Sequence, residues 1–237
     1  MEDSLTSTGD HSPRRDDHVP PTDDQVRAGQ AVYGRRVLAL YDWFVLGISN
    51  RFVWKCPTPQ LLALYDRHIT GNHLEVGVGT GYYLDRCRFP VSQPRLVLLD
   101  MNPNSLAATA RRVARYQPRV VQANALEPFP VEDDRFDSAG INYVLHCLPG
   151  DLRSKACVLD HLAATLNPGG VVFGSTILTR GLELGVLARP LIRFYNARGI
   201  FSNLNDSLVD LKEVLAARFS EVNVSTIGCV ALFVARK

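Results

Sequence analysis

The sequence lacks the features of a disulfide-stapled or membrane-spanning protein. Its five cysteines are scattered, form no C-x-x-C pair and are odd in number, so we expect neither a disulfide framework nor a metal site. The longest apolar stretch, residues 37–48, is interrupted by Asp42 and falls well short of the roughly 20 residues that a bilayer requires. The first residues lack the basic stretch followed by an apolar stretch that is typical of a secretory signal peptide. These absences predict a soluble, cytoplasmic chain without a membrane partner.

Excess charge of one sign is also missing. Lysine and arginine number 26 against 24 acidic residues, and seven of those acids fall in residues 1–25 beside two arginines. That segment has few residues to bury, so we expect a disordered acidic tail. The remainder is only mildly basic, and its one basic run, residues 110–119, has the pattern of a solvated helix face. We therefore expect no nucleic-acid partner.

What is present, over residues 26–237, is the pattern of a single domain. Residues 26–56 predict a helical N-terminal cap, residues 57–178 a core, residues 179–206 a separate segment, and residues 207–237 a last helix and hairpin. Within this part, seven short apolar runs predict strands at residues 73–78, 95–100, 119–122, 136–141, 171–177, 221–227 and 229–235. Helices are expected between them, at residues 80–87, 102–116, 152–166 and 207–219.

Strands that alternate with helices predict an α/β fold. We expect a doubly wound, mostly parallel seven-stranded sheet that ends in an antiparallel hairpin, with helices on both faces. Residues 179–206 are long for a connection and mix apolar residues with four arginines. They are either a lid over the substrate or an extra helix packed on the domain.

The most informative segment is the glycine-rich run at residues 74–82. Gly77, Gly79 and Gly81 directly follow a strand, which lets the backbone turn sharply and lets a ligand approach it closely. A dinucleotide fingerprint would need glycine at position 82, where tyrosine stands. Glu75 would repel a pyrophosphate but suits a cationic or zwitterionic ligand. The pattern disfavours NAD.

A carboxylate stands at the end of the next strand. Asp100 follows Gly81 by 19 residues, where an acid can accept hydrogen bonds from two ribose hydroxyls. A helix cap or a solvated strand end is the plain structural alternative. The glycine-rich run upstream favours ribose binding.

These segments resemble the motifs of class I S-adenosylmethionine-dependent methyltransferases, the Rossmann-like superfamily, of the small-molecule type. The resemblance covers residues 57–177 and keeps five motifs in order, at residues 74–82, 98–102, 122–130, 136–146 and 166–170. It implies S-adenosylmethionine as cofactor and small-molecule methylation, as in secondary metabolism. The family's antiparallel seventh strand agrees with the hairpin.

The resemblance also implies roles for individual residues. Glu75 and the backbone of the three glycines would hold the methionine part, Asp100 the ribose, and Met101 would pack on the adenine. Asn124, with Ala125 beside it, stands where many relatives have an aspartate that faces the adenine amino group. Asn142 would line the methionine end, and Tyr41 and Trp54 would close over the cofactor unless they belong to the core.

The acceptor is less defined. His146 is the candidate general base, although a base is needed only for an acceptor that is protonated at the working pH. We expect methyl transfer to oxygen or nitrogen of a small, fairly apolar metabolite. The alternatives are carbon methylation of a quinone-like ring and a catalytically silent cofactor-binding partner subunit. Oligomeric state is left open.

Overall fold

The computed structural model describes residues 49–131 and 134–237. The expected acidic tail, most of the N-terminal cap and Tyr41 lie outside the described residues. The strands are β1 (Asn72–Val76), β2 (Arg95–Asp100), β3 (Arg119–Gln122), β4 (Phe136–Asn142), β5 (Leu166–Ile177), β6 (Glu221–Ile227) and β7 (Val230–Arg236). The helices are α3 (Thr58–His68), α4 (Tyr82–Arg86), α5 (Pro103–Arg112), α6 (Cys157–Thr165), α7 (Ala188–Ala197) and α8 (Leu208–Ala216), with short turns η2 (Ala114–Tyr116) and η3 (Leu145–Cys147).

The described strands form one seven-stranded sheet in the order β3-β2-β1-β4-β5-β7-β6. The first five pair in parallel, and β7 pairs antiparallel with both β5 and β6. The expected fold class, including the terminal hairpin, is confirmed. The chain winds outward from β1 to β3 and then returns to β4, so the direction of winding reverses between β1 and β4. A ligand crevice is expected at such a reversal.

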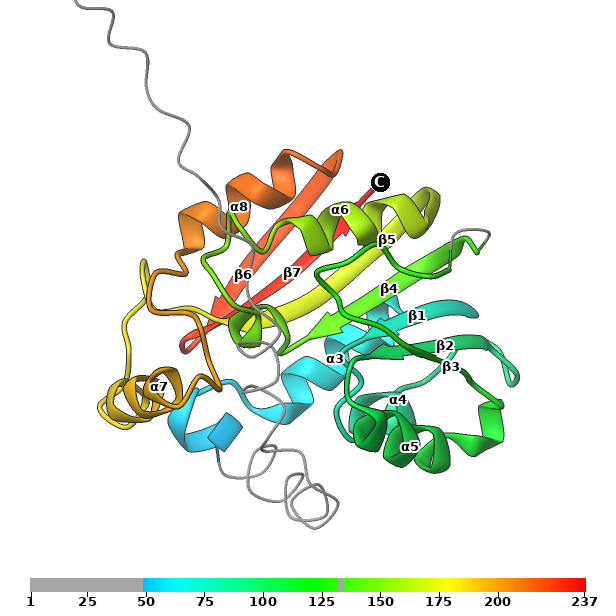
Figure 1. The fold of residues 1–237 in the computed structure, drawn as a ribbon, viewed down its shortest axis with the longest axis horizontal. Helices are drawn as coiled ribbons and strands as arrows, with labels where there is room; N and C mark the ends of the chain where they lie inside the picture. Colours follow the sequence, from blue (N-terminus) through cyan, green and yellow to red (C-terminus); the bar gives the residue numbers. More distant parts are fainter. Residues whose placement is uncertain (1–48, 132–133) are drawn as a thin grey trace, which may run out of the picture.

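Helices cover both faces of this sheet (Figure 1). α6 and α8 lie on one face, and α3, α4 and α5 lie on the other. The alternation along each strand creates the two cores: Leu74 and Val76 join the core under α6 and α8, whereas Leu96 and Leu98 join the core under α3 and α5. The central strands β1 and β2 therefore bury side chains in both directions, as expected of a parallel sheet.

Most predicted elements are observed near their expected bounds, with two corrections. β5 begins at Leu166, because this residue of the turn expected before it already pairs in the sheet, and the helix before β5 is shorter than expected. Asn102 caps α5 as expected, because its side chain accepts a hydrogen bond from the N–H of Asn104. The helix expected over residues 152–166 starts only at Cys157. Asp151 and Ser154 exchange hydrogen bonds and close a turn there instead. The turn sends Lys155 into the interior, where its side chain is fully buried.

The segment after β5 contains α7, which buries Ala188 and Ile192 against the core shared with α3. The C-terminal end of this segment is fixed by hydrogen bonds. The Ser202 N–H donates to the His146 carbonyl at 2.8 Å, and the Asn203 amide donates to the Ile177 carbonyl at 3.0 Å. Among the described helices, none is both long and apolar enough to cross a membrane.

Candidate functional site

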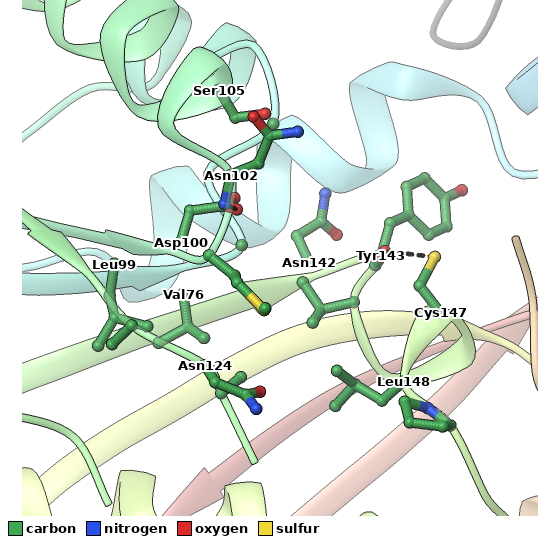
Figure 2. Close-up of a pocket in the computed structure, with 17 residues that line it drawn as sticks. Val76, Leu99, Asp100, Asn102, Ser105, Asn124, Asn142, Tyr143, Cys147 and Leu148 are labelled. Carbon is green, nitrogen blue, oxygen red and sulfur yellow. Dashed lines mark hydrogen bonds between the residues drawn. The ribbon is translucent and has the colours of Figure 1, made fainter. Parts of the chain in front are cut away.

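A pocket opens at the carboxyl ends of the parallel strands, where the winding reverses. Its walls come from the end of β1, the end of β2, the loop after β3 and the end of β4. Figure 2 shows Asp100, Asn142, Leu148 and Asn124 arranged around it. A second pocket adjoins it and shares Gly77, Gly79, Asn142 and Tyr143. The two form one elongated site across β1.

Asp100 supplies the acidic group of the first pocket. It ends β2, and its carboxylate accepts a hydrogen bond from the N–H of Asn102 at 2.8 Å. Burial raises the pKa of this carboxyl, while hydrogen bonds from backbone N–H groups, Asn102 foremost, oppose the rise. The acid is thus held rigidly at the strand end and exposed to the pocket, as a diol ligand requires.

The glycine-rich run lines both pockets. Gly79 has φ of +54°, and a Cβ built there would find no atom of the protein within 4 Å. The backbone therefore leaves open space that a ligand can enter, which is the geometry expected of a cofactor loop. Gly77 lines both pockets as well, and Gly81 lines the second.

The remaining walls of the first pocket are largely apolar. Leu99, Met101, Ala123, Ala125 and Leu148 line it. Asn124 lines it too, but its carbonyl oxygen accepts from the N–H of Leu126 at 3.1 Å and its amide donates to Glu127 at 3.2 Å. Asn124 therefore also closes a local turn. An apolar slot beside a carboxylate fits a planar base joined to a ribose.

The second pocket contains Glu75, which is almost fully buried. One carboxylate oxygen accepts from the Tyr65 hydroxyl at 2.5 Å, and the other lies 3.0 Å from Nε2 of His73. Burial and the neighbouring Glu75 charge raise the pKa of Tyr65 well above its usual range, so Tyr65 stays a donor. A carboxylate supported in this way suits an ammonium group in the pocket.

Asn142 lies where the two pockets meet, at the end of β4. The Ser175 hydroxyl donates to its carbonyl oxygen, which leaves the amide N–H groups as donors for the pocket. The next residue, Tyr143, has a left-handed backbone with φ of +58° and lines both pockets. Such a backbone at a non-glycine residue is uncommon and typical of functional sites.

Two of the expected site residues line neither pocket. Trp54 is 3% exposed, and its ring packs at 6.0 Å from that of Phe201. His146 is also 3% exposed, and its ring packs edge-on against Phe201 at 4.5 Å. Burial, reinforced by the Lys155 charge, lowers the pKa of His146 to about 3. The structure places both side chains in the core.

Several lining residues were not expected from the sequence. Tyr65 reaches Glu75 from α3, and Tyr143, Cys147 and Leu148 border the first pocket from the turn after β4. Burial raises the pKa of the Cys147 thiol to about 12, so it is no nucleophile at neutral pH. Only the position of the turn after β4 could have pointed to Tyr143, Cys147 and Leu148, whereas no signal in the sequence pointed to Tyr65.

The fold and site together define a Rossmann-like protein that binds a nucleoside-bearing cofactor at the carboxyl edge of its sheet. Residues 74–172 match the family described as "Methyltransferase domain". The chain is 42% identical to demethylluteothin O-methyltransferase of Streptomyces thioluteus, over 92% of this chain and 94% of that one. It is 40% identical to the physcion biosynthesis cluster O-methyltransferase of Aspergillus chevalieri, over 88% and 95%. The chain belongs to this methyltransferase family.

A solved structure agrees with the fold. The DhpI–SAH complex superposes with a TM-score of 0.64 at 16% identity, covering 92% of this chain and 98% of that one. Together with the family match and the two O-methyltransferase relatives, the motifs identify the protein as an S-adenosylmethionine-dependent methyltransferase, as predicted from the sequence. The open space at Gly79, the Asp100 carboxylate and the apolar slot are the features of this chain that fit the cofactor.

Proposed function

We propose that this enzyme methylates an oxygen atom of a small, fairly apolar metabolite whose hydroxyl is acidic, such as a phenol or an enol. S-adenosylmethionine, when bound, supplies an electrophilic methyl group on a sulfonium sulfur. The chain's own task is to align the acceptor with that group and to keep water out. Both relatives described above are named as O-methyltransferases, which supports oxygen as the acceptor atom.

We assign the cofactor contacts as follows. Asp100 would accept from the ribose hydroxyls, Met101 and Ala125 would flank the adenine, and Asn124 would stand at its edge. Glu75 and Asn142 would hold the amino-acid part, together with the backbone at Gly77, Gly79 and Gly81. Each of these residues lines one or both pockets, which supports the assignment.

The observation that carries the acceptor class is the chemistry of the pocket wall. Of the described residues that line the two pockets, the carboxylic acids are Glu75 and Asp100, both assigned to the cofactor. Histidine is not among them, and the Cys147 thiol stays protonated at neutral pH. A neutral alcohol would need a base to lose its proton, whereas a phenol or an enol ionises in water.

The segment of residues 179–206 is proposed to cover the acceptor. It is anchored to the same turn that lines the first pocket, because Ser202 donates to the His146 carbonyl beside Cys147. It also presents Val186, which is 88% exposed, and Leu187, which is 60% exposed. Exposed apolar side chains on this segment suit contact with an apolar acceptor.

Two smaller proposals concern the setting. The five cysteines are unpaired, which supports a reducing compartment such as the cytoplasm. The described surface carries Arg111 and Arg112 at the end of α5 as a solvated helix face, which supports a small-molecule acceptor without a nucleic-acid partner.

The test is a transfer assay with labelled S-adenosylmethionine and matched acceptors of similar size: phenols of graded acidity, an aliphatic alcohol and an amine. We expect methylated oxygen by mass spectrometry, with rates that follow the ionised fraction of the phenol. Equal turnover of the alcohol would contradict the acceptor class. A methylated nitrogen or carbon would contradict the acceptor atom. Cofactor binding without transfer to any acceptor would favour a silent partner subunit.

A further inference from the structure

His73 lies directly behind Glu75, away from the pocket. Both residues occupy β1 and are two positions apart, so their side chains point to the same face of the sheet. That face otherwise holds apolar side chains such as Leu98 and Phe173. His73 is 0% exposed and Glu75 4%. Two polar groups buried in an apolar core are unfavourable unless each finds its hydrogen-bond partners.

Each of them is partnered, and together they form a chain. Nδ1 of His73 lies 2.8 Å from the hydroxyl of Ser138, and Nε2 lies 3.0 Å from Glu75. The Tyr65 hydroxyl donates to the other Glu75 oxygen. The His73 ring is fixed from the side as well, because it stacks on Phe173 at 5.7 Å with an interplanar angle of 22°.

One assignment of protons satisfies all four groups with a single charge. The Ser138 hydroxyl donates to Nδ1, Nε2–H of a neutral His73 donates to one Glu75 oxygen, and Tyr65 donates to the other. Glu75 is then an ionised acceptor. Each Glu75 oxygen accepts one hydrogen bond from the protein, and its remaining lone pairs can accept hydrogen bonds from a ligand in the pocket.

The neighbouring strand is shaped to admit this pair. Gly140 on β4 is the cross-strand partner of Glu75. A Cβ at Gly140 would lie 2.3 Å from a Glu75 oxygen and 3.3 Å from Cε1 of His73. The absence of a side chain at this position therefore creates the notch in which the carboxylate and the imidazole meet.

We propose that His73 and Ser138 are positioning residues that orient the Glu75 carboxylate toward the amino group of the cofactor. The inference rests on the proposed function, in which Glu75 holds the amino-acid part of S-adenosylmethionine. It adds a Ser138–His73–Glu75–Tyr65 chain that fixes the direction of the carboxylate. Neither His73 nor Ser138 lines the pockets, so each acts only through Glu75.

The test compares two ligands by calorimetry. S-adenosylhomocysteine carries the amino-acid part, whereas 5′-methylthioadenosine has the adenosine and the sulfur but no amino acid. We expect His73→Phe to weaken S-adenosylhomocysteine by at least about tenfold, because a hydrogen bond to a buried charge is lost. The affinity for 5′-methylthioadenosine should change by less than about twofold, because its contacts lie elsewhere. A merely structural loss would weaken both ligands alike.

Three variants sharpen the test. His73→Gln keeps an N–H near the position of Nε2 and should recover most of the lost affinity. Ser138→Ala removes the partner of Nδ1 without added volume. It should lower the affinity for S-adenosylhomocysteine by about threefold and leave the affinity for 5′-methylthioadenosine unchanged. His68→Phe is the matched control, since His68 also packs against Phe173, at 6.0 Å, and has no bond to Glu75. It should leave both affinities unchanged.

The outcomes separate cleanly. Equal losses for both ligands, or no loss for either, in His73→Phe would overturn the positioning role. If that variant does not fold, Ser138→Ala decides by the same comparison. Wild-type protein that fails to bind S-adenosylhomocysteine would refute the cofactor assignment itself. If the wild-type protein binds S-adenosylhomocysteine but the variants change the affinities for both ligands equally, only the positioning role is refuted.

Discussion

The backbone N–H of Ile177 donates a hydrogen bond to Nδ1 of His146, at a nitrogen-to-nitrogen distance of 3.3 Å. An accepting Nδ1 requires a neutral ring protonated at Nε2. Burial, with the Lys155 charge nearby, lowers the pKa of this histidine to about 3. His146 thus links the turn after β4 to the end of β5 and stays uncharged at neutral pH.

The pH dependence of stability follows from this bond. The unfolded chain protonates His146 near its ordinary pKa of 6.5, whereas the folded chain resists protonation down to about 3. The unfolded state therefore binds more protons in this range, and the His146 contribution to stability is lost as pH falls from 6.5 toward 3. Replacing His146 with Gln should flatten that slope in urea unfolding.

The same His146→Gln variant tests for a catalytic role. We expect its turnover to fall less than about tenfold. A drop beyond about 100-fold with retained fold would show that His146 is a catalytic base.

Removal of the Asp100 carboxylate should weaken cofactor binding. Asp100→Ala is expected to lose two charge-assisted hydrogen bonds, each worth about 1.5–3 kcal/mol, to the ribose. Calorimetry with S-adenosylhomocysteine measures the loss. Asp137→Ala is the control, because Asp137 is exposed near the start of β4, at the opposite edge of the sheet. Unchanged affinity in Asp100→Ala would reject the ribose assignment.

Trp54 should matter for stability more than for binding. Its carbonyl accepts from the Cys229 N–H at 3.1 Å, and its ring fills the core beside Phe201. Trp54→Ala should lower the free energy of unfolding by about 3–5 kcal/mol through the cavity that it leaves. Affinity for S-adenosylhomocysteine should stay within about twofold. Lost affinity at full stability would instead support a role in closing over the cofactor.

The buried ion pair of Lys155 and Asp206 leads to a further prediction about stability. The Lys155 ammonium lies 2.7 Å from the Asp206 carboxylate, and both side chains are 0% exposed. Lys155→Met leaves a buried charge alone and should destabilise the fold by about 3–5 kcal/mol at pH 8. Replacing Asp206 with Asn in the same chain should recover part of the loss.

The pH profile of that variant provides its own check. Burial already raises the pKa of Asp206 to about 6 with Lys155 present. A raised acid pKa means that the folded state binds the extra proton, so stability falls as pH rises through that value. The penalty of Lys155→Met in urea unfolding should therefore be smaller at pH 5 than at pH 8. An equal loss of stability at pH 5 and pH 8 would show that the Asp206 carboxylate is not left unpaired in Lys155→Met.

The segment before α7 should affect binding of the acceptor and not binding of the cofactor. Leu187→Ser removes an exposed apolar side chain and should raise the KM for the acceptor several-fold. Stability should change by less than about 0.5 kcal/mol, because the position is on the surface. Val209→Ser, at an equally exposed apolar residue of α8, is the matched control. The same KM in both variants would refute a covering role for residues 179–206.

Much of the fold was predictable because its signals are local. Short runs rich in apolar and β-branched residues predict strands, so β2, β3 and β6 were predicted at their observed bounds. The side-chain cap of Asn102 on α5 was likewise predictable, because a cap depends on residues two or three positions away. The pocket contacts of Asp100 and Gly79 follow from a strand end and a turn, which the order of residues already specifies.

The remaining features depended on which segments meet in space. The parallel sheet and the glycine-rich turn were predictable because each depends on residues that are close together in the chain. The class of cofactor followed from the resemblance of these motifs to a known family. The contacts of Tyr65 with Glu75 and of Ser138 with His73 could not be predicted, because they join α3, β1 and β4. Only the tertiary structure placed Trp54 and His146 in the core. Burial is a property of what surrounds a side chain, and residues distant in sequence supply those surroundings.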